Sequence, residues 1–181
     1  MTDSYENENN AIDGEEKMGS LNHGTVQNNI GGLLKFKCDK ELAVIIELSL
    51  DISQYDLSKY ELGVKEELKP DVCAYFKRPV IPDGFDDLVK VTQMPDLTIE
   101  ILSPKQTISY LLRKTKAYFE LGVKSSWLVI PPLDEVRVFS GLNSYKNFDL
   151  NHTEIIDEVM EIHLPIAKVF AYGNKERGCV T

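Results

Sequence analysis

The segment that decides the fold is Pro95-Asp96-Leu97-Thr98-Ile99-Glu100-Ile101-Leu102-Ser103-Pro104, an apolar run between prolines with a glutamate near its centre. Its length and apolar content predict a strand. Side chains alternate across a strand, so Leu97, Ile99 and Ile101 share one face, which we expect to be buried, and Glu100 lies on the other. A carboxylate at this position is costly to bury unless it is paired or bound to a metal ion. The alternatives are a solvent-facing carboxylate and one satisfied by an arginine.

The segments around this strand predict a mixed β-sheet flanked by helices, an α/β (α+β) fold. A helix is expected from Thr107 to Leu121, with Gly122 at its C-cap. A first helix is expected from Ser20, capped by Ser20 or Asn22, with an apolar face of Ile30, Leu33, Leu34 and Phe36. Further strands are predicted over 42–52, 72–76, 126–130, 135–140 and 145–150, and a short helix over 165–170. The segment 53–68 is predicted to hold a short strand or a loop. The segment 78–95 is predicted to form a long loop with room for a helical turn.

The length and composition predict one domain with a packed core, since the chain has 181 residues of which 43% are hydrophobic. Residues 1–18 contain six acids and one base, and we predict that they form a disordered acidic tail preceding a single domain over 19–181. The net charge of −9 argues against a broad basic nucleic-acid surface. That argument weakens when the tail, at −5, is set aside, because the remainder carries only −4.

The sequence lacks the signals that mark several other classes of protein. No apolar run approaches the roughly 20 residues of a membrane span, and no secretory signal opens the chain. Three widely spaced cysteines without a CxxC pair make structural zinc improbable and predict a reduced, cytoplasmic compartment. The sequence contains no GxGxxG, P-loop or GxSxG motif, which argues against the small-molecule enzymes that use them.

A second Pro-Asp step, Pro70-Asp71, supplies the expected partner for Glu100. Asp96 and Glu100 lie about 13 Å apart at roughly 3.3 Å per residue, too far to bind one ion together directly. If the strands at 71–77 and 97–102 pair antiparallel, Asp71 lies beside Glu100. Two adjacent carboxylates raise each other's pKa and favour a divalent cation between them. Asp96 is then expected to fix the start of its strand by hydrogen bonding.

The predicted helix over 107–121 offers two lysines to such a site. Lys114 and Lys116 each lie about 100° from the centre of the apolar stripe, on opposite flanks, while Arg113 points away. Spacing does not choose between the two, and either could equally be a solvated surface lysine. Lys105, directly after the strand, is a third candidate.

Taken together, these motifs resemble the Uma2 family of restriction-endonuclease-like proteins in the PD-(D/E)XK nuclease superfamily. The resemblance spans Ser20 to Ser140 and rests on four segments: Pro70-Asp71-Val72, Pro95 to Pro104, Lys114 with Tyr118 to Val123, and Trp127-Leu128-Val129. It implies a restriction-endonuclease-like mixed sheet flanked by helices.

The resemblance also implies a site. Asp71 and Glu100 match the two acidic positions that hold Mg²⁺, or Mn²⁺, and the Ile101 carbonyl would add a ligand. The superfamily lysine would stand at Leu102, and Lys114 matches a lysine on the following helix that is thought to replace it. Asp96 is a possible accessory residue.

Three aromatic or apolar positions and one histidine complete the comparison with the family. His23 matches a histidine of the first helix that could position a water, a phosphate or the metal ion; a capping or surface histidine is the alternative. Tyr118 and Trp127 are expected in the core rather than as base-stacking groups. Ile130, where many relatives carry aspartate, is not counted in the site.

The implied function is a Mg²⁺-dependent DNA endonuclease that hydrolyses phosphodiester bonds and acts as a homodimer. The alternative is a catalytically inactive module with a nuclease fold that binds DNA or another protein. The missing motif lysine and the acidic charge favour this alternative.

Overall fold

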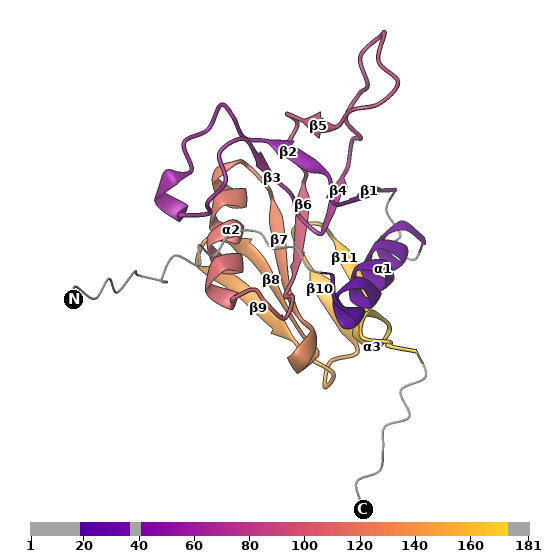
Figure 1. The fold of residues 1–181 in the computed structure, drawn as a ribbon. Coiled ribbons are helices and arrows are strands. Elements are labelled where there is room, and N and C mark those ends of the chain that lie inside the picture. The colour runs from indigo at the N-terminus through magenta and orange to yellow at the C-terminus, as the bar shows by residue number, and fades with distance from the viewer. Residues whose placement is uncertain (1–18, 37–40, 174–181) are drawn as a thin grey trace, which may run out of the picture.

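The computed structural model describes residues 19–36 and 41–173, so the predicted tail over 1–18 lies outside the described residues. A six-stranded sheet forms the centre of the fold (Figure 1). In the order in which they lie side by side, its strands are β1 (Ala43–Ile46), β4 (Val72–Tyr75), β6 (Leu97–Ile101), β7 (Ser125–Ile130), β8 (Glu135–Gly141) and β9 (Ser144–Phe148). β6 and β7 run parallel, and the other neighbours run antiparallel. The sheet is therefore mixed, as the sequence predicts.

Two smaller sheets and the helices surround this sheet. β3 (Glu67–Leu68), β2 (Ser49–Asp51) and β5 (Lys90–Val91) form one small sheet, and β10 (Glu154–Asp157) with β11 (Ile162–Pro165) forms a hairpin. The helices are α1 (Leu21–Phe36), α2 (Ile108–Glu120) and α3 (Ile166–Val169), with 3-10 turns η1 (Ser58–Tyr60) and η2 (Pro131–Leu133). α2 covers one face of the central sheet, and α1 covers the other together with the hairpin and α3 (Figure 1). Among the described residues, no helix combines the length and apolar character needed to cross a bilayer.

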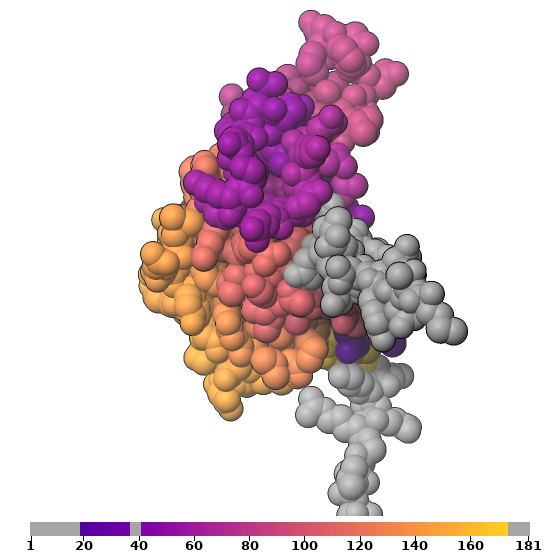
Figure 2. All heavy atoms as spheres, turned by 60° about the vertical axis from the view of Figure 1, so that its left-hand side comes forward, coloured from indigo at the N-terminus to yellow at the C-terminus, as the bar shows by residue number. Residues whose placement is uncertain are grey.

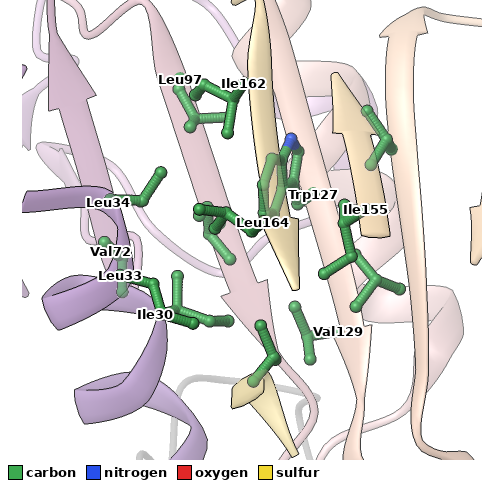
Figure 3. Packing of buried hydrophobic residues seen from close by; sticks show 14 of the residues in the cluster. Ile30, Leu33, Leu34, Val72, Leu97, Trp127, Val129, Ile155, Ile162 and Leu164 are labelled. Atoms are coloured by element: carbon green, nitrogen blue, oxygen red, sulfur yellow. The ribbon is translucent and has the colours of Figure 1, made fainter. Parts of the chain in front are cut away.

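The central strands are buried on both faces. Leu97, Ile99 and Ile101 of β6 pack in one apolar cluster with Ile30 of α1 and Trp127 of β7 (Figure 3). The other face of β7 packs against α2 in a second cluster. Burial on both faces explains why these strands read as nearly continuous apolar runs.

The first helix begins where the sequence predicts. The Ser20 side-chain oxygen accepts a hydrogen bond from the His23 N–H at 3.3 Å, which caps α1. Ile30 and Leu34 face the sheet (Figure 3), but Phe36 is 75% exposed and is not part of the apolar face. Gly31 permits the close approach of helix and sheet, because a Cβ there would lie 3.1 Å from the Ile46 side chain.

The second helix matches its predicted bounds to within one residue at each end. The Thr107 side chain accepts a hydrogen bond from the Tyr110 N–H and caps the N-terminus. Gly122, with φ of 92°, follows the C-terminus in the left-handed conformation that ends helices. These two caps fix where α2 begins and ends.

Three predictions about the remaining segments are wrong or incomplete. The single strand predicted over 42–52 is divided into β1 and β2, because the chain turns at Glu47, whose φ is 52°, and passes from one sheet to another. The loop over 78–95 contains β5 and no helix among its described residues. The segment between β4 and β5 projects from the body of the domain (Figures 1 and 2). The β10–β11 hairpin, whose two strands pair only with each other among the described residues, was not predicted from the sequence.

Candidate active site

Two buried carboxylates meet at the end of β6. β4 pairs antiparallel with β6, with Val72 opposite Ile99, and Asp71 directly precedes β4. The Asp71 carboxylate accepts a hydrogen bond from the Ile101 N–H at 2.7 Å, so it lies beside the residue that follows Glu100. Asp71 and Glu100 are 3% and 1% exposed, respectively. The antiparallel pairing thus brings Asp71 and Glu100 together, as expected from the two Pro-Asp steps.

Two side chains of α2 bind the same oxygen of Glu100. The Lys114 ammonium lies 2.8 Å from Glu100 Oε1, and the Tyr118 hydroxyl donates to that oxygen at 2.6 Å. Lys114 is fully buried and also donates to the Lys69 carbonyl at 3.2 Å. Because Lys114 and Tyr118 are four residues apart on one helix, both project toward the same point of the sheet. Glu100 is therefore neither solvent-facing nor satisfied by an arginine.

The surroundings of Glu100 raise its pKa. Burial is the largest cause and raises the pKa of Glu100, since a charged carboxylate is poorly solvated there. The positive charge of Lys114 opposes this rise, and the nearby Asp71 carboxylate adds to it. The two carboxylates are thus accompanied by one buried ammonium. A divalent cation beside them would add positive charge and offset their negative charge further.

His23 joins the cluster from the first turn of α1. Its Nε2 atom lies 3.3 Å from the Asp71 carboxylate, and its side chain is buried. One turn later, the Gln27 amide donates to the Asp71 carbonyl at 2.9 Å. The alternative of a surface histidine is wrong, because the packing of α1 beside the start of β4 buries the His23 side chain against Asp71.

Asp96 lies at the opposite end of β6 and does not join the cluster. Its carboxylate accepts a hydrogen bond from the Phe76 N–H at 2.8 Å and pairs with the Lys124 ammonium at 2.8 Å. These contacts fix the start of the strand, the role expected if Asp71 is the partner of Glu100.

The structure separates the three candidate lysines. Lys114 points to Glu100, whereas Lys116 is exposed on α2 and Lys105 is exposed in the turn after β6. Leu102, at the superfamily lysine position, packs against the apolar cluster under α2. The cation of the cluster therefore comes from the helix and not from β6.

Tyr118 is the site residue that the sequence reasoning missed. It is buried, as expected of a core residue, but its hydroxyl binds Glu100. The available signal was its spacing of four residues from Lys114. Trp127 is a core residue as predicted, and its indole N–H donates to Asp157.

The carboxylates of this cluster suit Mg²⁺ better than zinc. Within the described ranges, no group of three or more His, Cys, Asp or Glu side chains is placed to hold a metal ion. Mg²⁺ usually needs only one or two carboxylates, with waters and phosphate oxygens completing its shell. Both hydrogen-bonding contacts of the Glu100 carboxylate within the described part of the chain involve Oε1, which leaves Oε2 available as a ligand. The residues therefore fit Mg²⁺ and do not form a zinc cage.

A small cavity of about 150 Å³ gives access to this end of the sheet. Its lining includes His23, Gln27, Glu47 and Asp71. The unusual backbone of Glu47 turns the chain at the rim, where the Gln27 amide contacts its carboxylate at 3.4 Å. The cavity is thus acidic and reaches Asp71 from the side of α1.

The fold and the cluster define a restriction-endonuclease-like α/β domain with a buried carboxylate–lysine site. The chain belongs to the Uma2 family, described as putative restriction endonuclease, whose profile matches residues 6–166. The fold is similar to the crystal structure of a putative nuclease belonging to DUF820 from Anabaena variabilis, with a TM-score of 0.67 and 20% identity over 86% of this chain and 83% of that one. No curated protein matches the chain. The family resemblance and the fold class predicted from the sequence are both confirmed.

Proposed function

We propose that the protein is a Mg²⁺-dependent endonuclease that hydrolyses phosphodiester bonds of DNA. The observation that carries this proposal is the buried contact of 2.8 Å between the Lys114 ammonium and Glu100, beside Asp71. Membership of the Uma2 family and the similarity to a putative nuclease support nuclease activity.

Asp71 and Glu100 would hold the metal ion, with the Ile101 carbonyl as a further ligand. Bound Mg²⁺, or Mn²⁺ in its place, supplies neutralisation of charge at the scissile phosphate and a more acidic water. Asp71 and Glu100 are poorly solvated and repel each other. A divalent cation between them would lower this repulsion, which favours metal binding here.

The residues of the chain prepare the site. Lys114 can donate a hydrogen bond from Nζ to the attacking water and stabilise the negative charge that develops on the phosphate. Tyr118 holds Oε1 of Glu100, and His23 with the Ile101 N–H orients the Asp71 carboxylate. The expected products are a 5′-phosphate and a 3′-hydroxyl. A homodimer, also part of the proposal, would present two such sites to two strands.

The proposal is tested by nicking of plasmid DNA in Mg²⁺, in Mn²⁺ and in a chelator. Lys114→Met is expected to slow nicking by about 10²–10⁴-fold, the usual contribution of a positioned acid–base group. Asp71→Asn and Glu100→Gln remove proposed metal ligands and are expected to abolish metal-dependent nicking. Lys116→Met is the matched control, since this lysine is exposed on the same helix, and it is expected to retain the wild-type rate. Thermal unfolding of each variant separates loss of chemistry from loss of the fold.

The second candidate function is a non-catalytic module. Leu102 stands at the superfamily lysine position and the net charge is −9, which favours a non-catalytic module that binds DNA or protein. Absence of metal-dependent nicking by the wild-type chain on both single-stranded and double-stranded DNA would support that module. Nicking by folded Lys114→Met at the wild-type rate would contradict the assigned role of the lysine.

A further inference from the structure

A second cavity adjoins the acidic one at the same end of the sheet. His23, Ser103 and Gln106 line both cavities and form the wall between them. The acidic cavity contains Asp71 and Glu47, whereas the second has a volume of about 460 Å³ and lies between the start of α1, the turn from β6 to α2, and η2. A ligand in the larger cavity would therefore lie next to the carboxylate cluster.

The larger cavity is mainly apolar and carries no acid. Its walls include Leu21, Leu102, Pro104, Pro131 and Pro132. His23 is the one titratable side chain that lines it within the described residues. Flat proline and leucine surfaces favour an aromatic ring and do not favour a highly charged group, which needs paired charges or solvent.

One buried polar atom among the residues that line this cavity has no hydrogen-bond partner within the described residues. Ser103 is buried, and its side-chain oxygen has no hydrogen-bond partner within residues 19–36 and 41–173. The Gln106 side-chain carbonyl accepts the Ser103 N–H at 3.3 Å, and Asn22 lines the rim. Amide and hydroxyl groups can both donate and accept, the combination that reads the edges of nucleobases. An unpartnered buried hydroxyl is costly, so a ligand that pairs with it is favoured.

We propose that this cavity binds the base of an unpaired nucleotide adjacent to the scissile phosphate. The inference rests on the proposed nuclease function and names its substrate class as DNA with an unpaired or extruded nucleotide. The cavity volume lies within the range of about 300–1,000 Å³ found for pockets of small molecules. The net charge of −9 provides little general attraction to phosphate, so binding of a base in an apolar cavity supplies affinity that the surface does not.

The test compares two DNA duplexes that differ only in whether one 2-aminopurine is paired or bulged. Binding to the full chain is measured by anisotropy in Ca²⁺, an oxygen-seeking ion like Mg²⁺, together with the emission of the 2-aminopurine. We expect the bulged duplex to bind at least about tenfold more tightly, as one buried and stacked base typically contributes. An abasic site in place of the 2-aminopurine is expected to abolish this preference.

Variants locate the effect within the cavity. Asn22→Trp places a large ring at the rim from an exposed position of α1, and it is expected to bind both duplexes equally. Phe36→Trp, exposed at the other end of the same helix, is the control and is expected to keep the preference. Equal binding of both duplexes by the wild-type chain, or a preference that survives Asn22→Trp, overturns the inference.

The two proposals fail in different ways. Selective binding of the bulged duplex that depends on Asn22, without cleavage in Mg²⁺ or Mn²⁺, supports the base cavity and overturns the nuclease. Equal binding and equal cleavage of both duplexes overturns the base cavity and leaves the nuclease supported.

Discussion

Two carboxylates of this domain are buried to the same degree but in opposite chemical settings. Glu100 on β6 and Asp157 at the end of β10 are each 1% exposed. Burial therefore does not distinguish them. The hydrogen-bond partners of their oxygens distinguish the two carboxylates.

Asp157 is saturated by neutral donors. One oxygen accepts from the Ser125 hydroxyl at 2.6 Å and the Trp127 indole N–H at 2.7 Å. The other accepts from the backbone N–H groups of Val159 and Met160, each at 3.0 Å. This carboxylate joins the turn after β10 to the central strand β7, and both of its oxygens are fully used.

Glu100 has an unequal environment. Its Oε1 atom receives the Lys114 ammonium and the Tyr118 hydroxyl, and the described residues place no hydrogen-bond donor on Oε2. The comparison teaches that a structural carboxylate consumes its lone pairs within the protein, whereas a candidate catalytic one keeps an oxygen and a neighbouring cation for a ligand.

The largest expected effect comes from removing the structural carboxylate. Asp157→Ala leaves the Trp127 indole N–H and two backbone N–H groups without their acceptor, and we expect a loss of about 3–5 kcal/mol in unfolding free energy. Urea denaturation measures this change. Glu158→Ala is the control, since its pair with Lys146 is exposed and contributes less than about 1 kcal/mol. Equal losses in the two variants would contradict the structural role of Asp157.

A smaller loss of stability is expected when the hydrogen bond from Tyr118 to Oε1 of Glu100 is removed. Tyr118→Phe keeps the packed ring and removes one hydrogen bond to a carboxylate, which costs about 1.5–3 kcal/mol. The same denaturation experiment checks this value, and the nicking rate shows whether Oε1 must be held for activity. Tyr145→Phe, on an exposed ring of β9, should change the stability by less than about 0.5 kcal/mol. An unchanged unfolding free energy for Tyr118→Phe would mean that the contact does not stabilise the charged form.

The smallest expected effect is a dependence of stability on pH. Because the pKa of Glu100 is raised in the folded chain, the folded state holds the proton to higher pH than the unfolded state does. Stability from this group is thus greatest below the ordinary pKa of 4.5 and declines as pH rises toward the raised value, by at most about 1.4 kcal/mol per pH unit for one proton. The measurement is the difference in unfolding free energy between wild type and Glu100→Gln from acid to neutral pH. A difference that is constant, or that grows in favour of wild type as pH rises, would contradict the raised pKa.

Much of the fold and part of the site follow from local patterns. The capping residues Ser20 and Thr107 mark the starts of both long helices. The two Pro-Asp steps predict which carboxylates meet, because antiparallel pairing leaves little choice of register. The caps depend on residues close together in the sequence, whereas the meeting of Asp71 and Glu100 follows from local strand patterns only once an antiparallel pairing is assumed.

Other features required contacts between distant segments. Spacing placed Lys114 and Lys116 symmetrically about the apolar stripe, and only the rotation of α2 against the sheet buries one and exposes the other. The burial of His23 against Asp71 depends likewise on how α1 crosses β4. The role of Asp157 was missed for the same reason, since the Ser125 and Trp127 side chains that it binds lie about 30 residues earlier in the chain.

The sequence by itself determined that Leu97, Ile99 and Ile101 form one buried face of β6, and it determined the helix that follows, the pair of carboxylates and the family. The tertiary structure alone decided which lysine pairs with Glu100, which carboxylate is saturated, and that a mainly apolar cavity adjoins the acidic one. The physical reason is that a local pattern specifies which face of an element is apolar. The partners of a buried polar group are set by how separate elements pack, and each such group is stable only where that packing supplies a donor, an acceptor or a counter-charge.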